Sequence, residues 1–409
     1  MKKTTLKNGL TVITNHDGNA KATMLTYWVK VGGNNEKNYP YGIAHFTEHM
    51  LFKGTKNRTS EEINESIDGI GGNFNASTSA ERTNYFTQVP FTGWEVATEV
   101  LSDMLFYSTF PIDEMEKEKK VVTEEIKRYE DDPGSQAYDL MMDELMKHYP
   151  ERKNILGTRE SVASITQEDL NRFVNEFYQP SNMVFVATGN INHEMLCEKL
   201  EALTPKNSKS VIYEVEPFVP YELGGKTVSL EKDIKQAHLR WMLFAPTGHD
   251  KDAHVFDLVG TLLGGSMSSR LFKIIREEKG LAYTANAGYA GGNSMGMLIG
   301  YVGTDVANLE DVKTTIIEQL ERLKTEPVSE KELSKVKSLK SGRLLMAQDY
   351  KESINRDLAM KHLFELGEDV MEYTKKINAI TAEDIMRVAN TYFGEKKVLF
   401  AQIVPKKEA

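Results

Sequence analysis

The sequence predicts an α+β fold made of two homologous domains, each an antiparallel sheet covered by helices. The main observation is an internal repeat, because residues 164–178 and 379–393 share six identical positions of 15 without a gap. In addition, each segment precedes an apolar run, 183–188 or 398–404, of the kind that forms buried strands. Strands and helices mix in each half without strict alternation, which favours an α+β arrangement.

The repeated segments are predicted to be amphipathic helices that begin at matching positions. Thr166 and Thr381 fit the N-cap of each helix, and Asp169 and Asp384 fit the third helical position. A side-chain oxygen at the N-cap satisfies a backbone N–H that has no partner inside the helix. The two copies therefore begin their last helix in the same way.

The front ends of the copies correspond more loosely. Lys7–Ile13 resembles the lead-in to a hairpin, and Gly224–Val228 occupies the matching place in the second copy. Strands are expected around Trp28 and Trp241, followed by helices near 42–53 and 254–263. A period of about 200 residues indicates a duplicated domain rather than a solenoid. The expected division is a first domain, a Pro-rich polar linker and a second domain, at 1–204, 205–224 and 225–409.

Composition excludes several classes of protein. The chain of 409 residues carries a formal net charge of −10, which argues against a nucleic-acid partner. No stretch approaches the roughly 18 apolar residues of a membrane span, and no apolar segment follows the basic N-terminus. A cytoplasmic protein is therefore expected, and a mature organellar form stays open. The single cysteine, Cys197, rules out an internal disulfide and a cysteine-based metal site.

The pattern His45-Phe46-Thr47-Glu48-His49 predicts a catalytic zinc site. Histidines at i and i+4 project from one face of a helix, so both imidazoles can bind one Zn²⁺. Glu48 lies beside that face and can take a proton from a water that the metal activates. This order is the inverse of the commoner H-E-x-x-H and is a known metallopeptidase signature. The alternative is an ordinary helix with two surface histidines.

A catalytic zinc site needs a third protein ligand and one open position. The helix predicted at 113–130 carries Glu118 and Glu125, which are seven residues apart and therefore share one face. Val122 lies between them, so this face includes buried surface. From the residues alone, either glutamate could equally be a solvated charge.

The run His45–Thr55, HFTEHMLFKGT, resembles the pitrilysin, insulysin and mitochondrial-processing-peptidase family, and especially its short bacterial zinc proteases. The resemblance covers nearly the whole chain, including the duplicated domain plan. It implies that the third ligand follows the second histidine by 76 residues, which is Glu125 here. It also implies that Glu118 orients a ligand. Glu124 is the competing third ligand, but its side chain points about 100° away.

The same resemblance assigns residues outside the zinc set. Asn75, Ala76, Ser77 and Thr78 match an edge strand that pairs with the substrate backbone. In the second half, Arg276 and Tyr283 match an arginine and a tyrosine that contact the substrate carbonyl and the developing oxyanion. A structural strand is the alternative for the first set, and ordinary surface residues for the second.

The second copy lacks the zinc residues. Counting from a Trp28/Trp241 correspondence, the positions of His45, Glu48 and His49 fall on Leu258, Thr261 and Leu262. Counting from Pro111/Pro327, those of Glu118 and Glu125 fall on Ser334 and Ser341. Only the first domain is therefore expected to bind zinc.

These features predict a metalloendopeptidase with one Zn²⁺ per chain that cleaves short or unfolded peptides, with Glu48 as general base. The alternatives are a non-catalytic scaffold or core subunit of the same fold, and a metal-binding protein without peptidase activity. Longer family members join four such domains in one chain, with the zinc in one half and the Arg/Tyr pair in the other. Because this chain carries both sets, a homodimer with sites shared between chains is expected, and an inactive homologue as partner is the alternative.

Overall fold

The computed structural model describes residues 1–149, 154–212 and 218–406. Two compact units divide the chain, and each takes one segment from the opposite half of the sequence. The first unit contains residues 1–128, 149–215 and 348–365; the second contains 129–148, 216–347 and 366–409. Two homologous α+β halves are confirmed, and the exchanged segments are an addition that the repeat did not indicate.

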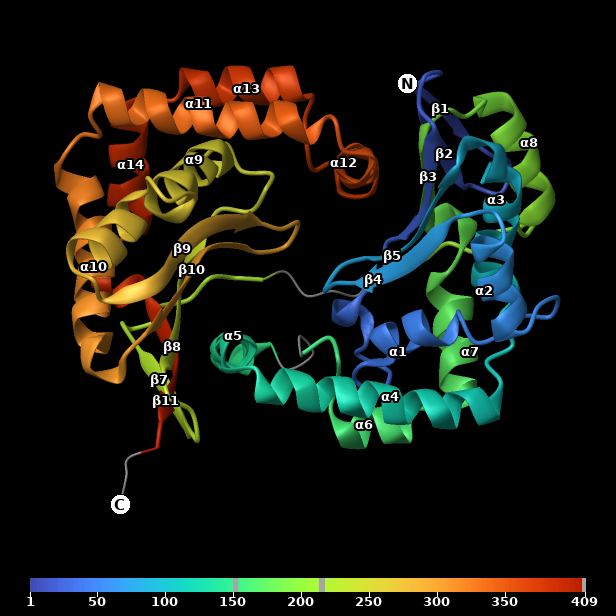
Figure 1. The fold of residues 1–409 in the computed structure, drawn as a ribbon, viewed down its shortest axis with the longest axis horizontal. Helices are drawn as coiled ribbons and strands as arrows, with labels where there is room; N and C mark the ends of the chain where they lie inside the picture. The colour runs from blue at the N-terminus through green and yellow to red at the C-terminus, as the bar shows by residue number, and fades with distance from the viewer. Residues whose placement is uncertain (150–153, 213–217, 407–409) are drawn as a thin grey trace. The chain divides into compact units, whose positions relative to one another are not determined.

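The first unit is a six-stranded sheet with helices on both faces (Figure 1). The strand order is β1-β2-β6-β3-β5-β4, which places β4 at an edge. Its strands are β1 (Lys2–Thr5), β2 (Thr11–His16), β3 (Ala22–Val29), β4 (Asn73–Thr78), β5 (Thr83–Pro90) and β6 (Met183–Gly189). Its helices are α1 (Ile43–Met50), α2 (Ser60–Asp68), α3 (Trp94–Tyr107), α4 (Ile112–Asp131), α6 (Arg159–Ser164), α7 (Gln167–Phe177), α8 (His193–Leu203) and α12 (Lys351–Phe364).

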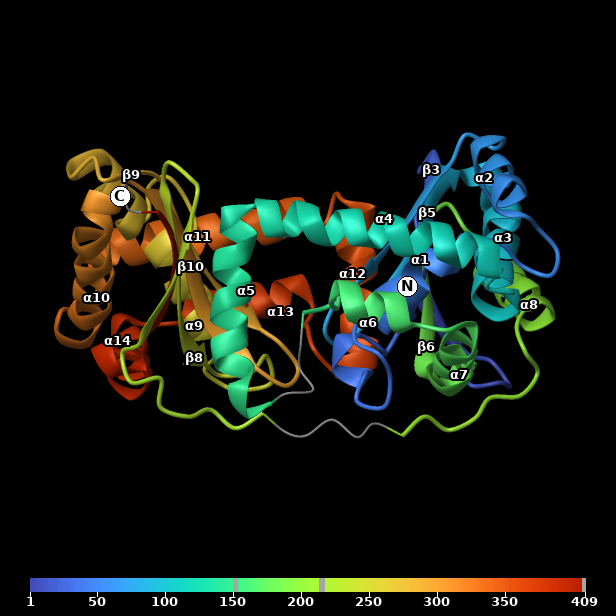
Figure 2. The same cartoon turned by 90° about the horizontal axis from the view of Figure 1, so that it is seen from below.

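The second unit repeats the plan with a five-stranded sheet in the order β7-β11-β8-β10-β9. Its strands are β7 (Thr227–Lys232), β8 (Ala237–Ala245), β9 (Ala282–Gly291), β10 (Gly296–Thr304) and β11 (Leu399–Pro405). Its helices are α5 (Pro133–Leu145), α9 (Ala253–Gly264), a π-helical turn (Phe272–Glu278), α10 (Leu309–Thr325), α11 (Glu330–Ala347), α13 (Val370–Ala379) and α14 (Ala382–Tyr392). Figure 2 shows α5 on one side of this sheet and α10 and α14 on the other.

The sheets are mixed rather than purely antiparallel. β2 pairs with β6 in parallel, and β7 pairs with β11 in parallel, while the other ladders are antiparallel. The parallel pairs arise because β6 and β11 come from the end of each copy and insert between strands from its beginning. The capping prediction is confirmed, since Thr166 and Thr381 each accept a hydrogen bond from the backbone N–H of Asp169 and Asp384.

The Trp28/Trp241 correspondence is wrong by one residue. In the ladders, Tyr27 pairs with Phe185, whereas Trp241 pairs with Phe400, the repeat partner of Phe185. Since neighbouring strand residues face opposite sides of a sheet, Trp28 points to the face covered by α12 and Trp241 points to the main core. When the alignment of the two copies is shifted by one residue, the positions of His45, Glu48 and His49 correspond to three buried apolar residues. These are Val259, Leu262 and Leu263.

Each exchanged helix covers one face of the sheet in its unit. α12 lies against β3 and β6, and α5 lies against β8 and β11. Asn355 of α12 is fully buried; its amide oxygen accepts a hydrogen bond from Trp28 Nε1 at 2.8 Å, and its amide nitrogen donates to the Val186 carbonyl at 3.0 Å. This amide therefore fixes α12 on the sheet of the first unit.

Within the described residues, no helix is long and apolar enough to cross a membrane. The longest, α4, carries charged side chains along most of its length.

We expect Asn355→Leu to lower the free energy of unfolding of the first unit by about 2–3 kcal/mol. The reason is that the Trp28 indole N–H, which donates to Asn355, would remain buried without a partner. Urea unfolding followed by tryptophan emission measures the change. Asn171→Ala is the control, because Asn171 is an exposed residue that bonds only within its own helix. Equal unfolding midpoints for the two variants would contradict this role.

Candidate metal centre

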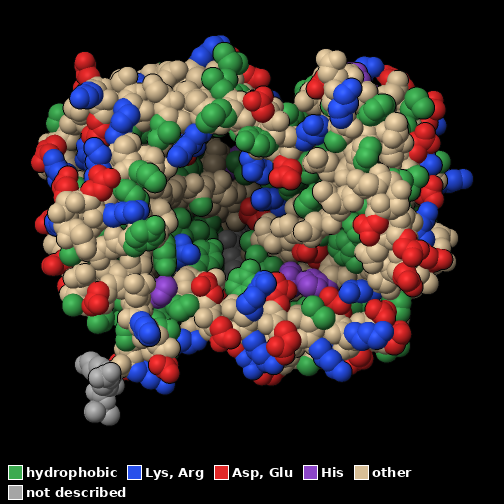
Figure 3. Space-filling model, in the orientation of Figure 1, with side chains coloured by type: hydrophobic (Ala, Val, Ile, Leu, Met, Phe, Trp, Pro, Cys, Tyr) green, Lys and Arg blue, Asp and Glu red, His purple; other side chains and the backbone are tan. Residues whose placement is uncertain are grey.

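The helix α1 presents the His45 and His49 side chains one turn apart. Its other face is anchored by Ile43, Phe46 and Met50, which are fully buried in the core between the sheet and the helices. The two imidazole centroids are 4.6 Å apart. Figure 3 shows histidine side chains at the surface in the region of α1, beside the charged side chains of α4. Core packing therefore sets the direction in which the imidazoles point.

Glu125 of α4 completes a cluster of three ligand groups. Its Oε2 lies 3.7 Å from His45 Nε2 and 3.6 Å from His49 Nε2. Two atoms that each lie about 2.0–2.1 Å from a tetrahedral zinc are about 3.3–3.4 Å apart, so these side chains fit one ion with little movement. Among the residues that the structure describes, this is the only such cluster of three histidine, cysteine or carboxylate groups.

Glu118 lies behind His49 rather than in the ligand cluster. Its Oε1 is 2.7 Å from His49 Nδ1, and its Oε2 is 2.6 Å from the Lys53 ammonium. Burial opposes ionisation of Glu118, but hydrogen bonds from His49 and Lys53 outweigh it and hold the pKa of the carboxyl below its usual value. The ionised carboxylate keeps the proton of His49 on Nδ1 and leaves Nε2 free to bind a metal.

The two histidines differ in their surroundings. Burial lowers the pKa of His45 to about 3, so its imidazole is neutral at pH 7, the form that binds metals. For His49, burial also lowers the pKa, but the hydrogen bond that it donates to Glu118 and the nearby carboxylates raise it above the usual value. His45 Nδ1 is buried and has no hydrogen-bond partner among the described residues.

Glu48 lies beside the cluster and is held by a different element. Its Oε2 accepts a hydrogen bond from the Thr78 hydroxyl at 2.5 Å. Burial raises the pKa of Glu48 above the ordinary carboxyl value, and the Thr78 hydrogen bond opposes this shift. The carboxyl group is therefore close to the cluster without being one of its three members.

Glu124, the competing ligand, points away from the histidines. Its side chain is 70% exposed and forms an ion pair with Lys127 at 2.5 Å, whereas the Glu125 side chain is 23% exposed. Because successive residues of a helix point about 100° apart, the Glu125 carboxylate faces the cluster and the Glu124 carboxylate faces solvent.

The predicted edge strand is β4, and no described strand pairs with its outer edge. Asn75 and Ser77 are exposed, while Thr78 turns inward to Glu48. Ala76 donates its backbone N–H to the Asn75 side-chain oxygen at 2.8 Å. Thr78 thus contacts Glu48 through its side chain, a contact that the sequence did not indicate.

Lys53 is a second contact that sequence reasoning missed. The signal was present, because Lys53 follows His49 by four residues and lies within the run that carries the family resemblance. Its ammonium neutralises Glu118 on the side opposite His49.

In the second unit, Arg276 and Tyr283 lie together. The Arg276 guanidinium carbon is 4.3 Å from the centroid of the Tyr283 ring and 4.9 Å from that of Phe272. Tyr283 is 77% exposed at the start of the edge strand β9. Arg276 is in the π-helical turn, a conformation that often occurs at functional sites.

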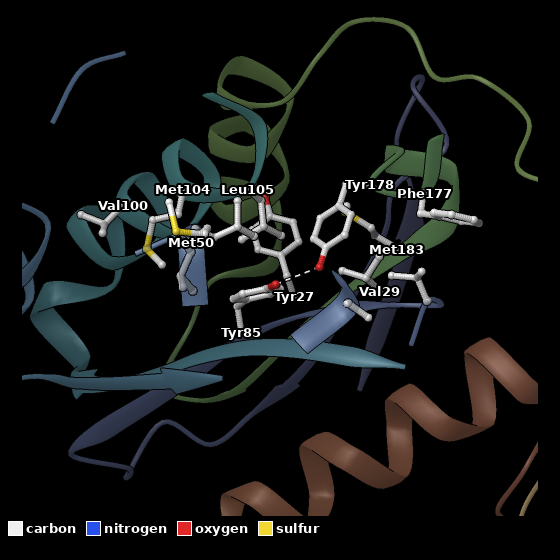
Figure 4. Close-up of a cluster of buried hydrophobic side chains, with 14 of the residues drawn as sticks. Tyr27, Val29, Met50, Tyr85, Val100, Met104, Leu105, Phe177, Tyr178 and Met183 are labelled. Carbon is white, nitrogen blue, oxygen red and sulfur yellow. Dashed lines mark hydrogen bonds between the residues drawn. The ribbon is translucent and has the colours of Figure 1, made fainter. Parts of the chain in front are cut away.

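A buried aromatic cluster supports the sheet beside α1. Figure 4 shows the Tyr85 and Tyr178 hydroxyls joined by a hydrogen bond, which measures 2.8 Å, with Met50 of α1 packed in the same cluster. Burial raises the pKa of both tyrosines, so their hydroxyls stay protonated and can satisfy each other.

Comparison with known proteins agrees with this arrangement. The profile described as Insulinase (Peptidase family M16) matches residues 11–159, and that of the Peptidase M16 inactive domain matches residues 164–340. The uncharacterized zinc protease YmxG of Bacillus subtilis (strain 168) is 34% identical over 98% of this chain and 97% of its own length. An uncharacterized zinc protease of Rickettsia felis is 32% identical, covering 95% and 94%.

The fold also matches a crystal structure of a protease from Helicobacter pylori, with a TM-score of 0.91 over 99% of both chains and 24% identity. Together, fold and sequence define a peptidase-like protein built from two homologous α+β units. The chain belongs to peptidase family M16, which confirms the resemblance drawn from residues 45–55.

We expect Glu125→Gln to lower zinc occupancy sharply and Glu124→Gln to leave it unchanged. An amide is a much weaker zinc ligand than a carboxylate, and only Glu125 reaches both imidazoles. Metal content of the two purified variants, measured after dialysis against a weak chelator, checks this. Equal zinc content would exclude Glu125 as the third ligand.

Proposed function

We propose that the protein is a zinc-dependent endopeptidase that cleaves short or unfolded peptides. The observation that carries the proposal is the convergence of His45, His49 and Glu125 next to a separate, half-buried carboxylate, Glu48. Three protein ligands with a neighbouring general base are the arrangement of catalytic zinc sites, whereas structural sites use four ligands. One zinc per chain follows, because the cluster occurs once in the described residues.

The protein groups have distinct tasks in this reaction. A bound zinc supplies Lewis-acid polarisation of the scissile carbonyl and lowers the pKa of the attacking water. Glu48 takes the proton of that water and passes it to the leaving amine. Thr78 holds Oε2 of Glu48, which leaves Oε1 to carry the proton.

The free edge of β4 supports an extended peptide as substrate. An edge strand offers unpaired N–H and C=O groups, and β4 also carries Thr78, which contacts Glu48. A peptide paired along β4 would lie beside the base. Folded proteins rarely offer a free extended segment, so short or unfolded chains are the preferred class.

The second candidate is a non-catalytic protein of the same fold. It is suggested by the match of the second half to an inactive domain, and by the apolar residues of α9 at the zinc positions. The first half argues against it, because a scaffold has no need of the half-buried Glu48 carboxylate beside three convergent ligands. Measured turnover distinguishes the two.

Glu48→Gln should keep about one zinc per chain and lose turnover by about 10²–10⁴-fold, because the base is not a ligand. Zinc analysis and cleavage of a mixed peptide library, each with and without chelator, measure both properties. Glu124→Gln is the matched control, since the same exchange on an exposed side chain should keep the wild-type rate. A Glu48→Gln variant that cleaves at the wild-type rate, or a wild-type protein that cleaves nothing, would contradict the peptidase function.

We further propose a homodimer in which Arg276 and Tyr283 of one chain act in the site that contains the zinc of the other. Two observations support it: Arg276 and Tyr283 lie against each other, and the Tyr283 side chain is largely exposed on the single chain. A tyrosine hydroxyl can donate to a developing oxyanion, and an arginine can hold a substrate carbonyl. A two-fold dimer would then contain two equivalent composite sites.

Complementation tests this assembly. Glu48→Gln and Tyr283→Phe are each expected to be weak, yet their purified mixed dimer should regain about half of the wild-type activity, because one of its two sites is intact. In the reciprocal control, a chain with both substitutions is paired with wild type, and every shared site carries one lesion. If the control is active and the first mixed dimer is not, Arg276 and Tyr283 act with the zinc site of their own chain. A fully active monomer would also contradict the shared site.

A further inference from the structure

Glu36 is a buried carboxylate that the proposed reaction does not use. It lies in the segment between β3 and α1 and is only 1% exposed. Its Oε2 accepts a hydrogen bond from the Gly42 backbone N–H at 2.8 Å, and its Oε1 accepts one from the Ala44 N–H at 2.9 Å. Both oxygens are therefore committed to the first turn of α1.

The start of α1 cannot provide its own cap. The N-cap residue is Gly42, with φ +86°, and it has no side chain that could accept a hydrogen bond. A larger residue is excluded, since a Cβ at this position would lie 2.6 Å from the Leu156 carbonyl oxygen. The first N–H groups of a helix have no partner within the helix, and α1 has only eight residues, so an external acceptor is needed.

Glu36 is costly to bury, which argues for a specific task. Burial raises the pKa of its carboxyl to about 8, and the hydrogen bonds from Ala44 and Gly42 partly offset this shift. A neutral apolar residue could fill the same space without that cost. What a carboxyl group adds is two acceptors at a defined separation, matched to two N–H groups of one helical turn.

The two hydrogen bonds to Glu36 lie next to the metal centre in the sequence. Ala44 directly precedes His45, and the next turn carries Glu48 and His49. The apolar anchors of α1 fix which face is buried, but apolar contacts are not directional and define the exact rotation of so short a helix less sharply than hydrogen bonds do. Two hydrogen bonds donated by backbone N–H groups at its start to one carboxyl group fix the rotation and the position of the helix along its axis.

We propose that Glu36 is a positioning residue of the metal centre, which clamps the first turn of α1 so that His45 and His49 meet Glu125 at the spacing one ion requires. The inference rests on the proposed zinc site. A residue that only stabilised the fold would not change zinc affinity, whereas loss of the hydrogen bonds from Gly42 and Ala44 to Glu36 should weaken zinc binding.

The test compares Glu36→Gln with a matched helix-cap variant, Thr381→Ala. Gln keeps the size of the side chain and one acceptor, but its NH₂ group faces one of the two N–H donors. Thr381 caps α14 in the second unit, so its loss weakens a helix that carries no ligand. Zinc affinity is measured by competition with a chromophoric chelator, and the melting temperature is recorded for each apo-protein.

Glu36→Gln should bind zinc about 10- to 100-fold more weakly than wild type, the range found when groups that orient metal ligands are removed. Glu36→Ala, which removes both acceptors, should bind more weakly still. Thr381→Ala should melt at a lower temperature with unchanged zinc affinity. In the cobalt-substituted proteins, the visible absorption bands of Glu36→Gln should shift, while those of Thr381→Ala should match wild type.

Wild-type zinc affinity and an unchanged cobalt spectrum in folded Glu36→Gln would overturn the proposal, as would an equal loss of affinity in Thr381→Ala. Near-ultraviolet circular dichroism checks that each variant is folded. The failure of the proposed function is distinguishable, because it requires that wild type bind no zinc or cleave no peptide, whereas this inference fails on Glu36→Gln alone.

Discussion

The burial of one face of α1 is the constraint on which the candidate site depends. Ile43, Phe46 and Met50 are removed completely from solvent, and burying three side chains of this size contributes roughly 1.5–3 kcal/mol each. Since α1 has only eight residues, packing rather than helical propensity holds it. Once this face is buried, the imidazoles of His45 and His49 have one direction left, toward α4.

Around that helix, the carboxyl groups of Glu118 and Glu48 each have a hydrogen-bond donor from the protein. Glu118 shares its two oxygens between His49 and Lys53, and Glu48 is held by Thr78. In a region of low dielectric an unpaired charge is costly, so each carboxyl group needs a donor. The consequence is a rigid site in which Glu125 and the imidazole Nε2 atoms face one another with little need for rearrangement.

The two copies of the fold have diverged at one helix while keeping their sheets. α1 and α9 occupy matching places, but α9 is apolar at the positions equivalent to the ligands and packs them into the core of its own unit. Each unit also takes a helix from the other half of the sequence, α12 in the first and α5 in the second. A duplicated chain can thus keep one architecture and restrict the metal cluster to one copy.

The sequence by itself determined the features that depend on local spacing. The i, i+4 histidines, the seven-residue interval between Glu118 and Glu125, and the capped repeat helices follow from helical periodicity. Tertiary structure alone decided the rest. The strand ladders determine the one-residue shift of Trp241, and the buried Asn355 amide holds α12 on its sheet. Contacts between residues far apart in the chain join Thr78 to Glu48 and Lys53 to Glu118. Periodicity gives the direction of a side chain on its own element, but the partner it meets is chosen by packing between elements distant in the chain.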